Sequence, residues 1–239
     1  MDTIDPFSPN LPAPTANRPL LGLTVLVIED SKFACEAIRL LCLRSGARIR
    51  RADSLRSARR HLQVYRPSVA IVDLGLPDGN GEDLIKDLVE DTPRPLIVLG
   101  TSGDPHSRDT AMTAGADGFL AKPITSLAAF QEAILANLPV DRHPHGPRIV
   151  TDETVIPDPI AYQDDMAHVA DVLEDSKDNR TLDYVAQFLG GVARSAKDHN
   201  MLKASEALAA RRDASEPTSS ETARIIGLIQ QRLTERIAI

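Results

Sequence analysis

The chain has 239 residues, of which 42% are hydrophobic and 26% are charged, and its formal net charge is -7. This composition supplies a folded core, so a disordered chain is excluded, and the length allows one or two domains. Net acidity disfavours binding to nucleic acid unless the chain has a local basic patch, and none is predicted. Residues 160–239 hold ten basic and thirteen acidic residues, which disfavours a DNA-reading domain there.

The first 21 residues are rich in proline and predict a flexible leader. They lack the basic start and the continuous apolar stretch of a signal peptide, and no later run is long enough to span a membrane. Cys35 and Cys42 fall on one predicted helix, too far apart to form a disulfide. Two free thiols fit a reducing cytosol, so we expect a cytoplasmic protein without membrane contact.

Strand and helix patterns alternate from residue 22 to about residue 140. Strands are predicted at 23–28, 48–51, 69–74, 95–100 and 118–122, and helices at 32–45, 54–65, 82–90, 107–114 and 126–138. Such alternation builds a parallel sheet with helices on both faces, and right-handed crossovers make the sheet doubly wound. The predicted fold of residues 22–140 is therefore α/β, with a five-stranded parallel sheet.

The C-terminal third of the chain has a different pattern. Residues 141–159 contain four prolines and no periodicity, which predicts a linker. In residues 160–239, apolar residues such as Leu182, Val185 and Leu189 recur at helical spacing, which predicts a small all-α bundle of roughly four helices. Thr218 and Glu221 have the spacing of a capping box for the last helix.

The ends of the predicted strands carry the polar residues that could do chemistry. Parallel sheets bind ligands beyond the carboxyl ends of their strands, where Glu29, Asp30, Asp73, Thr101 and Lys122 should meet. Three neighbouring carboxylates raise each other's pKa, and a divalent cation with oxygen ligands, Mg²⁺, relieves their repulsion. The ammonium and hydroxyl groups would stabilise a transferring phosphoryl group, with Asp73 as the nucleophile that becomes an aspartyl phosphate.

Residues 22 to about 140 resemble the receiver domains of two-component response regulators. Four sequence elements carry the resemblance: the pair Glu29–Asp30, VDLGLPDGNG around Asp73, VLGTSGD around Thr101, and GADGFLAKP, which ends at residue 123. The resemblance implies a flavodoxin-like sheet and Asp73 as the phosphoacceptor. It also implies that Asp30 binds Mg²⁺ directly, that Glu29 binds it through water, and that the backbone carbonyl of Gly75 is a further ligand.

The resemblance further implies a switch on the opposite side of the site. Thr101 and Lys122 would contact the phosphoryl oxygens, and Phe119 matches the aromatic residue that repositions when Thr101 moves. The Lys122–Pro123 peptide bond matches one that is usually cis in this family. Gly75 and Ser102 place small groups beside Asp73, which predicts easier access for water and a shorter phosphoryl lifetime.

The sequence thus predicts a response regulator rather than an enzyme. A sensor histidine kinase or a histidine phosphotransfer protein would phosphorylate Asp73, and residues 160–239 would bind a downstream protein or a second copy of the chain. A phosphorelay adaptor or phosphate sink stays open, because Ala193–Lys197 resembles a segment of phosphotransfer domains, with Arg194 in place of the histidine. A Mg²⁺-dependent phosphohydrolase is disfavoured, because no acid stands two residues after Asp73.

Overall fold

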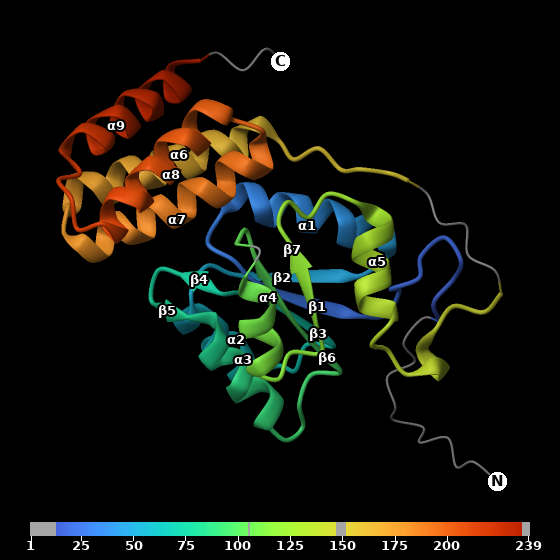
Figure 1. Cartoon of the computed structure of the whole chain (residues 1–239). Coiled ribbons are helices and arrows are strands. Elements are labelled where there is room, and N and C mark those ends of the chain that lie inside the picture. The colour runs from blue at the N-terminus through green and yellow to red at the C-terminus, as the bar shows by residue number, and fades with distance from the viewer. Residues whose placement is uncertain (1–12, 105, 147–151, 236–239) are drawn as a thin grey trace, which may run out of the picture.

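The computed structural model describes residues 13–104, 106–146 and 152–235. Five parallel strands form one sheet in the order β2-β1-β3-β6-β7 (Figure 1). They are β1 (Thr24–Ile28), β2 (Arg48–Ala52), β3 (Val69–Asp73), β6 (Ile97–Ser102) and β7 (Gly118–Ala121). The strands β3 and β6 are buried along their whole length, as is typical of a parallel sheet with both faces covered. The predicted doubly wound sheet is confirmed.

Helices cover the two faces of the sheet and create two separate hydrophobic cores. The helices α1 (Lys32–Ser45) and α5 (Leu127–Leu135) cover one face, where Ile38 and Phe130 are fully buried. The helices α2 (Leu55–Val64), α3 (Gly81–Glu90) and α4 (Ser107–Thr113) cover the other face, around Ile85 and Ala111. Because helices pack on both faces of the sheet, the end of each strand is held in a fixed position. The polar residues that follow the strands are therefore also held in place.

The helix boundaries follow the local signals in the sequence. Ser31 Oγ accepts a hydrogen bond from the Ala34 backbone N–H at 3.0 Å and caps α1, and Gly46 ends that helix with a φ of 84°, which glycine adopts without strain. A two-stranded antiparallel hairpin, β4 (Gly75–Leu76) and β5 (Gly79–Asn80), lies between β3 and α3, where no strand was predicted. A short 3-10 turn, Val140–Arg142, follows α5.

Four helices form a bundle within residues 152–235. They are α6 (Pro159–Asp175), α7 (Asn179–Ala196), α8 (His199–Asp213) and α9 (Ser219–Thr234), and they enclose a third core that includes Met166, Leu189 and Ile225. The predicted bundle is confirmed, but its capping box is wrong. Thr218 precedes α9 with helical backbone angles, and its side chain makes no capping hydrogen bond. Of the helices described, none has the length and apolarity needed to cross a bilayer.

Parts of the expected leader and linker pack onto the α/β unit. Leu20, from the expected leader, is fully buried in the core beside α1 and α5. Thr154 forms a bridge with Ser126, and Val155 is buried in the same core. Residues 1–12 and 147–151 lie outside the described residues. The domain limits themselves stay a prediction.

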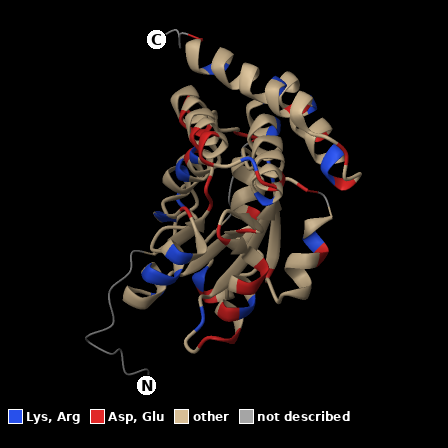
Figure 2. Ribbon diagram, turned by 90° about the vertical axis from the view of Figure 1, so that its left-hand side faces the viewer, with Lys and Arg blue, Asp and Glu red and all other residues tan. Residues whose placement is uncertain are grey.

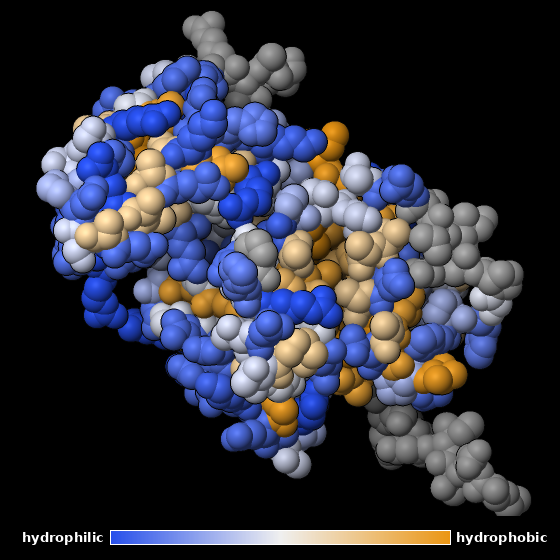
Figure 3. Space-filling view, viewed as in Figure 1, coloured by the Kyte–Doolittle hydropathy of each residue, from blue (hydrophilic) through white to orange (hydrophobic). Residues whose placement is uncertain are grey.

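The surface mixes charged and apolar residues. Large exposed hydrophobic side chains are scattered over several elements, and on the face seen in Figure 3 the outer side of the bundle is mostly hydrophilic. Lys, Arg, Asp and Glu occur on both units (Figure 2).

Arginines are concentrated in one stretch of the α/β unit. They lie on β2, on α2 and just after α2, and they are Arg48, Arg50, Arg51, Arg56, Arg59, Arg60 and Arg66. In the described part of the chain, ion pairs join Arg59 to Asp87 and Arg66 to Asp91. Averaging charge over whole segments hid this local density.

The bundle sits over the carboxyl ends of the strands, next to the first turn of α1 (Figure 1). Helix α6 packs against α1, and α7 approaches both α1 and β4. The carboxyl edge of the sheet, where the sequence predicts the functional site, is therefore covered by helices of the bundle.

Candidate functional site

Asp73 and Lys122 meet at the carboxyl edge of the sheet. Asp73 ends β3 and pairs in register with Thr101 on β6. Lys122 directly follows β7, and its ammonium lies 2.9 Å from Asp73 Oδ2 and 2.6 Å from Glu29 Oε2. These three side chains are at most 9% exposed. The expected convergence of residues from separate strands is present.

Three carboxyl groups crowd this edge. One ligand oxygen each from Glu29, Asp30 and Asp73 lie within 4.8 Å of one another. Burial raises the pKa of Glu29 to about 8 and that of Asp30 to about 7, and the negative charge of Asp73 adds to both shifts. Lys122 opposes these shifts, but one ammonium cannot balance three carboxylates. The site therefore carries excess negative charge when all three are ionised.

This donor set fits a magnesium ion. The groups are all oxygen ligands, and a divalent cation would favour the charged form of each carboxylate. Burial lowers the pKa of Lys122, yet the charges of Asp73 and Glu29 outweigh burial and raise it, so the ammonium stays protonated. Glu29, Asp30 and Asp73 could hold the metal, and the ligand role expected for the backbone carbonyl of Gly75 stays a prediction.

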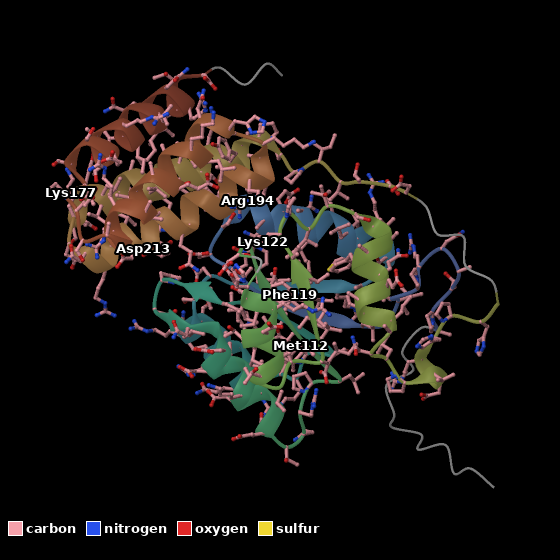
Figure 4. All side chains as sticks on the ribbon, viewed as in Figure 1. Met112, Phe119, Lys122, Lys177, Arg194 and Asp213 are labelled. Atoms are coloured by element: carbon pink, nitrogen blue, oxygen red, sulfur yellow. The ribbon has the colours of Figure 1, made fainter. Side chains whose placement is uncertain are left out.

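The predicted switch residues lie on β6 and β7. Thr101 is fully buried, and its hydroxyl donates a hydrogen bond of 2.7 Å to the backbone carbonyl of Leu120. Phe119 lies on β7 and is half-buried against the hydrophobic core that α2, α3 and α4 cover. The Lys122–Pro123 peptide bond is cis, as the resemblance implies. Figure 4 shows Phe119 on β7 and Lys122 just beyond the end of that strand, nearer the bundle.

Glycines allow the chain to approach closely around Asp73. A Cβ at Gly81 would lie 1.9 Å from the backbone oxygen of Asp73, so only glycine lets α3 start there. A Cβ at Gly75 would lie 2.1 Å from Nε2 of Gln187 on α7. The small residue at position 75, which the sequence linked to water access, thus also makes room for a side chain from the bundle.

Helix α7 adds residues to the site that the sequence did not predict. Tyr184 donates a hydrogen bond of 2.8 Å to Asp30 Oδ2, and burial followed by the charge of Asp30 raises the pKa of this phenol. Arg194, which the sequence placed at a phosphotransfer position, donates a hydrogen bond of 2.6 Å to the carbonyl of Gly103. A cavity of about 370 Å³ lies between the units, lined by Asp73 and Lys122 on one side and by Gln187 on the other.

Helix α6 anchors the bundle beside this cavity. Asp165 is buried and accepts hydrogen bonds from the backbone N–H of Lys32 at 2.7 Å, from that of Phe33 at 3.1 Å, and from the hydroxyl of Ser31 at 2.7 Å. These are donors at the start of α1, where a helix has no internal acceptors. Burial raises the pKa of Asp165 to about 6, against the hydrogen bonds that favour its charged form.

Comparison with known proteins identifies the α/β unit. Residues 25–134 match the family described as response regulator receiver domain. This segment is a receiver domain of two-component signal transduction. The assignment confirms the resemblance seen in the sequence, and the helical bundle lies outside the matched residues.

Individual relatives agree with the family. The chain is 34% identical over 99 residues to the KDP operon transcriptional regulatory protein KdpE of Escherichia coli, which covers 41% of this chain and 44% of the relative. It is 31% identical over 116 residues to the virulence transcriptional regulatory protein PhoP of Salmonella typhimurium, which covers 47% and 52%. The chain therefore matches only about half the length of these curated relatives.

A solved structure is also similar. The signal receiver domain of a signal transduction histidine kinase from Syntrophus aciditrophicus is 23% identical and covers 52% of this chain and 97% of that one, with a TM-score of 0.45.

Proposed function

We propose that this protein is a Mg²⁺-dependent response regulator in which Asp73 accepts a phosphoryl group from a phosphohistidine. The donor would be a sensor histidine kinase or a histidine phosphotransfer protein in the cytoplasm. The observation that carries the proposal is the contact of 2.9 Å between Asp73 and Lys122 within a cluster of buried carboxylates. A buried nucleophile beside a fixed positive charge suits phosphoryl transfer, in which positioning and charge stabilisation do most of the catalysis.

The receiver residues would divide the work as follows. An Asp73 oxygen attacks phosphorus as the bond from phosphorus to the histidine nitrogen breaks, and that nitrogen keeps the electron pair. Lys122 stabilises negative charge on the phosphoryl oxygens. Glu29 and Asp30 would hold Mg²⁺, which supplies further positive charge when bound. No second acid follows Asp73 by two residues, which supports a protein that modifies only itself rather than a phosphohydrolase.

Movement of Thr101 would link phosphorylation of Asp73 to a change in the rest of the receiver. The Thr101 hydroxyl must leave the Leu120 carbonyl in order to reach a phosphoryl group on Asp73. That movement would change the packing of neighbouring Phe119, which sits half-buried on β7. A phosphoryl group at Asp73 would therefore bias the receiver between two arrangements. The helical bundle would then bind a downstream protein or a second copy of the chain, or serve a relay as an adaptor or phosphate sink.

The experiment uses the full chain, Mg²⁺ and ³²P-labelled acetyl phosphate, with Asp73→Asn as the matched variant. We expect stoichiometric label in the wild type that hydroxylamine removes, as it does from acyl phosphates, and no label in Asp73→Asn. Chelation of Mg²⁺ should abolish labelling. Equal labelling of the two proteins would refute Asp73 as the acceptor. Sustained turnover of many phosphomonoesters would favour the phosphohydrolase.

A further inference from the structure

Gln187 lies where it could act on a phosphoryl group at Asp73. It projects from α7 onto Gly75, close enough that an added Cβ there would meet both its Nε2, at 2.1 Å, and its Cδ, at 2.7 Å. Gly75 in turn donates its backbone N–H toward Asp73 Oδ1 at 3.4 Å. The Gln187 side chain is exposed to the cavity that Asp73 and Lys122 also line.

The cavity has room for the reaction that this placement allows. A phosphoryl group on Asp73 would extend into it, with the helix α7 beyond. Displacement at phosphorus is in line, so an attacking water must enter opposite the bond to Asp73, on the side of α7. A volume of about 370 Å³ holds a phosphoryl group and several waters, since one water occupies about 30 Å³ of liquid.

Gln187 is the α7 side chain best suited to hold that water. Its amide both accepts and donates hydrogen bonds, and within the described residues no hydrogen bond engages it. Arg194 can only donate, and it already bonds to the Gly103 carbonyl and lies 3.6 Å from Glu206. The Ser195 hydroxyl donates to the Gly191 carbonyl at 3.0 Å. A glutamine that orients an attacking water is an established device in phosphoryl-transfer proteins.

We infer that the helical bundle is a built-in phosphatase element for its own receiver domain, with Gln187 as the residue that positions the hydrolytic water. The inference rests on the proposed phosphorylation of Asp73. The water oxygen bonds to phosphorus, the bond from phosphorus to the Asp73 oxygen breaks, and the carboxylate keeps the electron pair. The water proton leaves on the released inorganic phosphate. Only water is consumed, so the docked bundle limits the lifetime of the signal.

The test measures loss of label from the full-length protein. The wild type, Gln187→Ala, Gln187→Asn and Gln230→Ala are labelled with ³²P-acetyl phosphate and Mg²⁺, freed of donor by desalting, and followed by release of inorganic phosphate. Gln230 is an exposed glutamine on α9 and serves as the matched control. We expect phosphate release to slow about tenfold in Gln187→Ala. Removal of a fully preorganised hydrogen-bonding group from an active site costs roughly 10²–10³-fold in rate, and we expect a smaller loss because Gln187 is exposed. Gln187→Asn, one methylene shorter, should also be slow, and Gln230→Ala should match the wild type.

A second measurement separates water positioning from a structural role. Asp165→Ala, which weakens docking of the bundle, should also slow release, and the double variant with Gln187→Ala should be no slower than the slower single variant, because both remove the same contribution. Thermal midpoints of Gln187→Ala and the wild type should agree. Labelled wild type and Gln187→Ala that release phosphate at equal rates, or faster release from the variant, would overturn the inference alone. A wild type that takes up no label would overturn the proposed function instead.

Discussion

Two glycines beside Asp73 are needed for different reasons. Gly81 lies against the backbone oxygen of Asp73, whereas Gly75 lies against the flexible end of Gln187. A backbone atom in a buried sheet cannot move without shifting its strand, but a side-chain amide can swing away. Substitution by alanine should therefore destabilise the protein at position 81 and leave its stability nearly unchanged at position 75, with different effects on the phosphoryl group.

Gly81→Ala should destabilise the protein by about 3 kcal/mol, within the range for overpacking a close contact. The added methyl group would have to push the Asp73 backbone aside, so phosphorylation should fall as well. Urea unfolding and labelling with acetyl phosphate measure the two effects. A change in unfolding free energy below about 0.5 kcal/mol, the range of ordinary surface substitutions, would contradict this account of Gly81.

Gly75→Ala should be nearly neutral for stability but should prolong the aspartyl phosphate. The methyl group would displace the Gln187 amide, which can rotate at little cost, and so disturb the water that Gln187 is proposed to hold. The expected result is a thermal midpoint close to the wild type with slower release of labelled phosphate. Unchanged release would count against an effect of Gln187 on the phosphoryl group.

The first turn of α1 is capped both by its own N-cap residue and by a residue from the bundle. Ser31 accepts a hydrogen bond from the Ala34 backbone N–H, and Asp165 on α6 accepts from the backbone N–H groups of Lys32 and Phe33. A carboxylate at a helix N-terminus also interacts favourably with the helix dipole. The bundle is therefore attached at the helix that leads directly from the Glu29–Asp30 pair.

Asp165→Ala should lower the unfolding free energy by about 2 kcal/mol, because three donors, two of them in buried hydrogen bonds, lose their acceptor. Asp164 provides the neighbouring control, since its ion pair with Lys32 at 3.3 Å is about half exposed on both sides. Asp164→Ala should cost less than about 0.5 kcal/mol. Hydrogen exchange should rise at the first turn of α1 in Asp165→Ala only. Equal losses in the two variants would mean that Asp165 contributes no more than a surface charge.

The elements show what the sequence could predict. The site residues at the strand ends could be predicted because Glu29, Asp73 and Lys122 each follow an apolar run. A parallel sheet brings the carboxyl ends of such runs together. The bundle residues that contact the receiver segment could not be predicted. Helical periodicity shows which face of a helix enters the bundle core, but it does not show what the opposite face contacts. Asp165 and Tyr184 are typical polar residues of a solvated helix until α1 is placed beside them.

The receiver segment and the helical bundle share a polar junction. Each unit has its own hydrophobic core, and the junction is made mainly by the contacts of Asp165, Tyr184 and Arg194, with one edge-to-face contact between Phe33 and Tyr162. Polar interfaces between domains allow relative motion more readily than large apolar ones. The junction is therefore suited to opening and closing over Asp73.

Opening of the junction should control which donors can phosphorylate Asp73. A phosphohistidine on a donor protein would have to reach Asp73 through the cavity that α7 also lines, whereas acetyl phosphate is small enough to enter that cavity. Asp165→Ala should therefore raise the initial rate of transfer from a phosphorylated histidine phosphotransfer protein at least about fivefold, because weaker docking increases the open population. Transfer from acetyl phosphate should change less than about twofold.

Initial rates are the relevant measurement, because the proposed hydrolysis would otherwise alter the amount of label at later times. Asp164→Ala again serves as the control and should transfer at the wild-type rate from both donors. If Asp165→Ala accelerated both donors equally, the effect would lie in the reactivity of Asp73 rather than in access to it. If neither donor reacted faster, the docked bundle would not restrict access, and a protein donor would have to reach Asp73 with α7 in place.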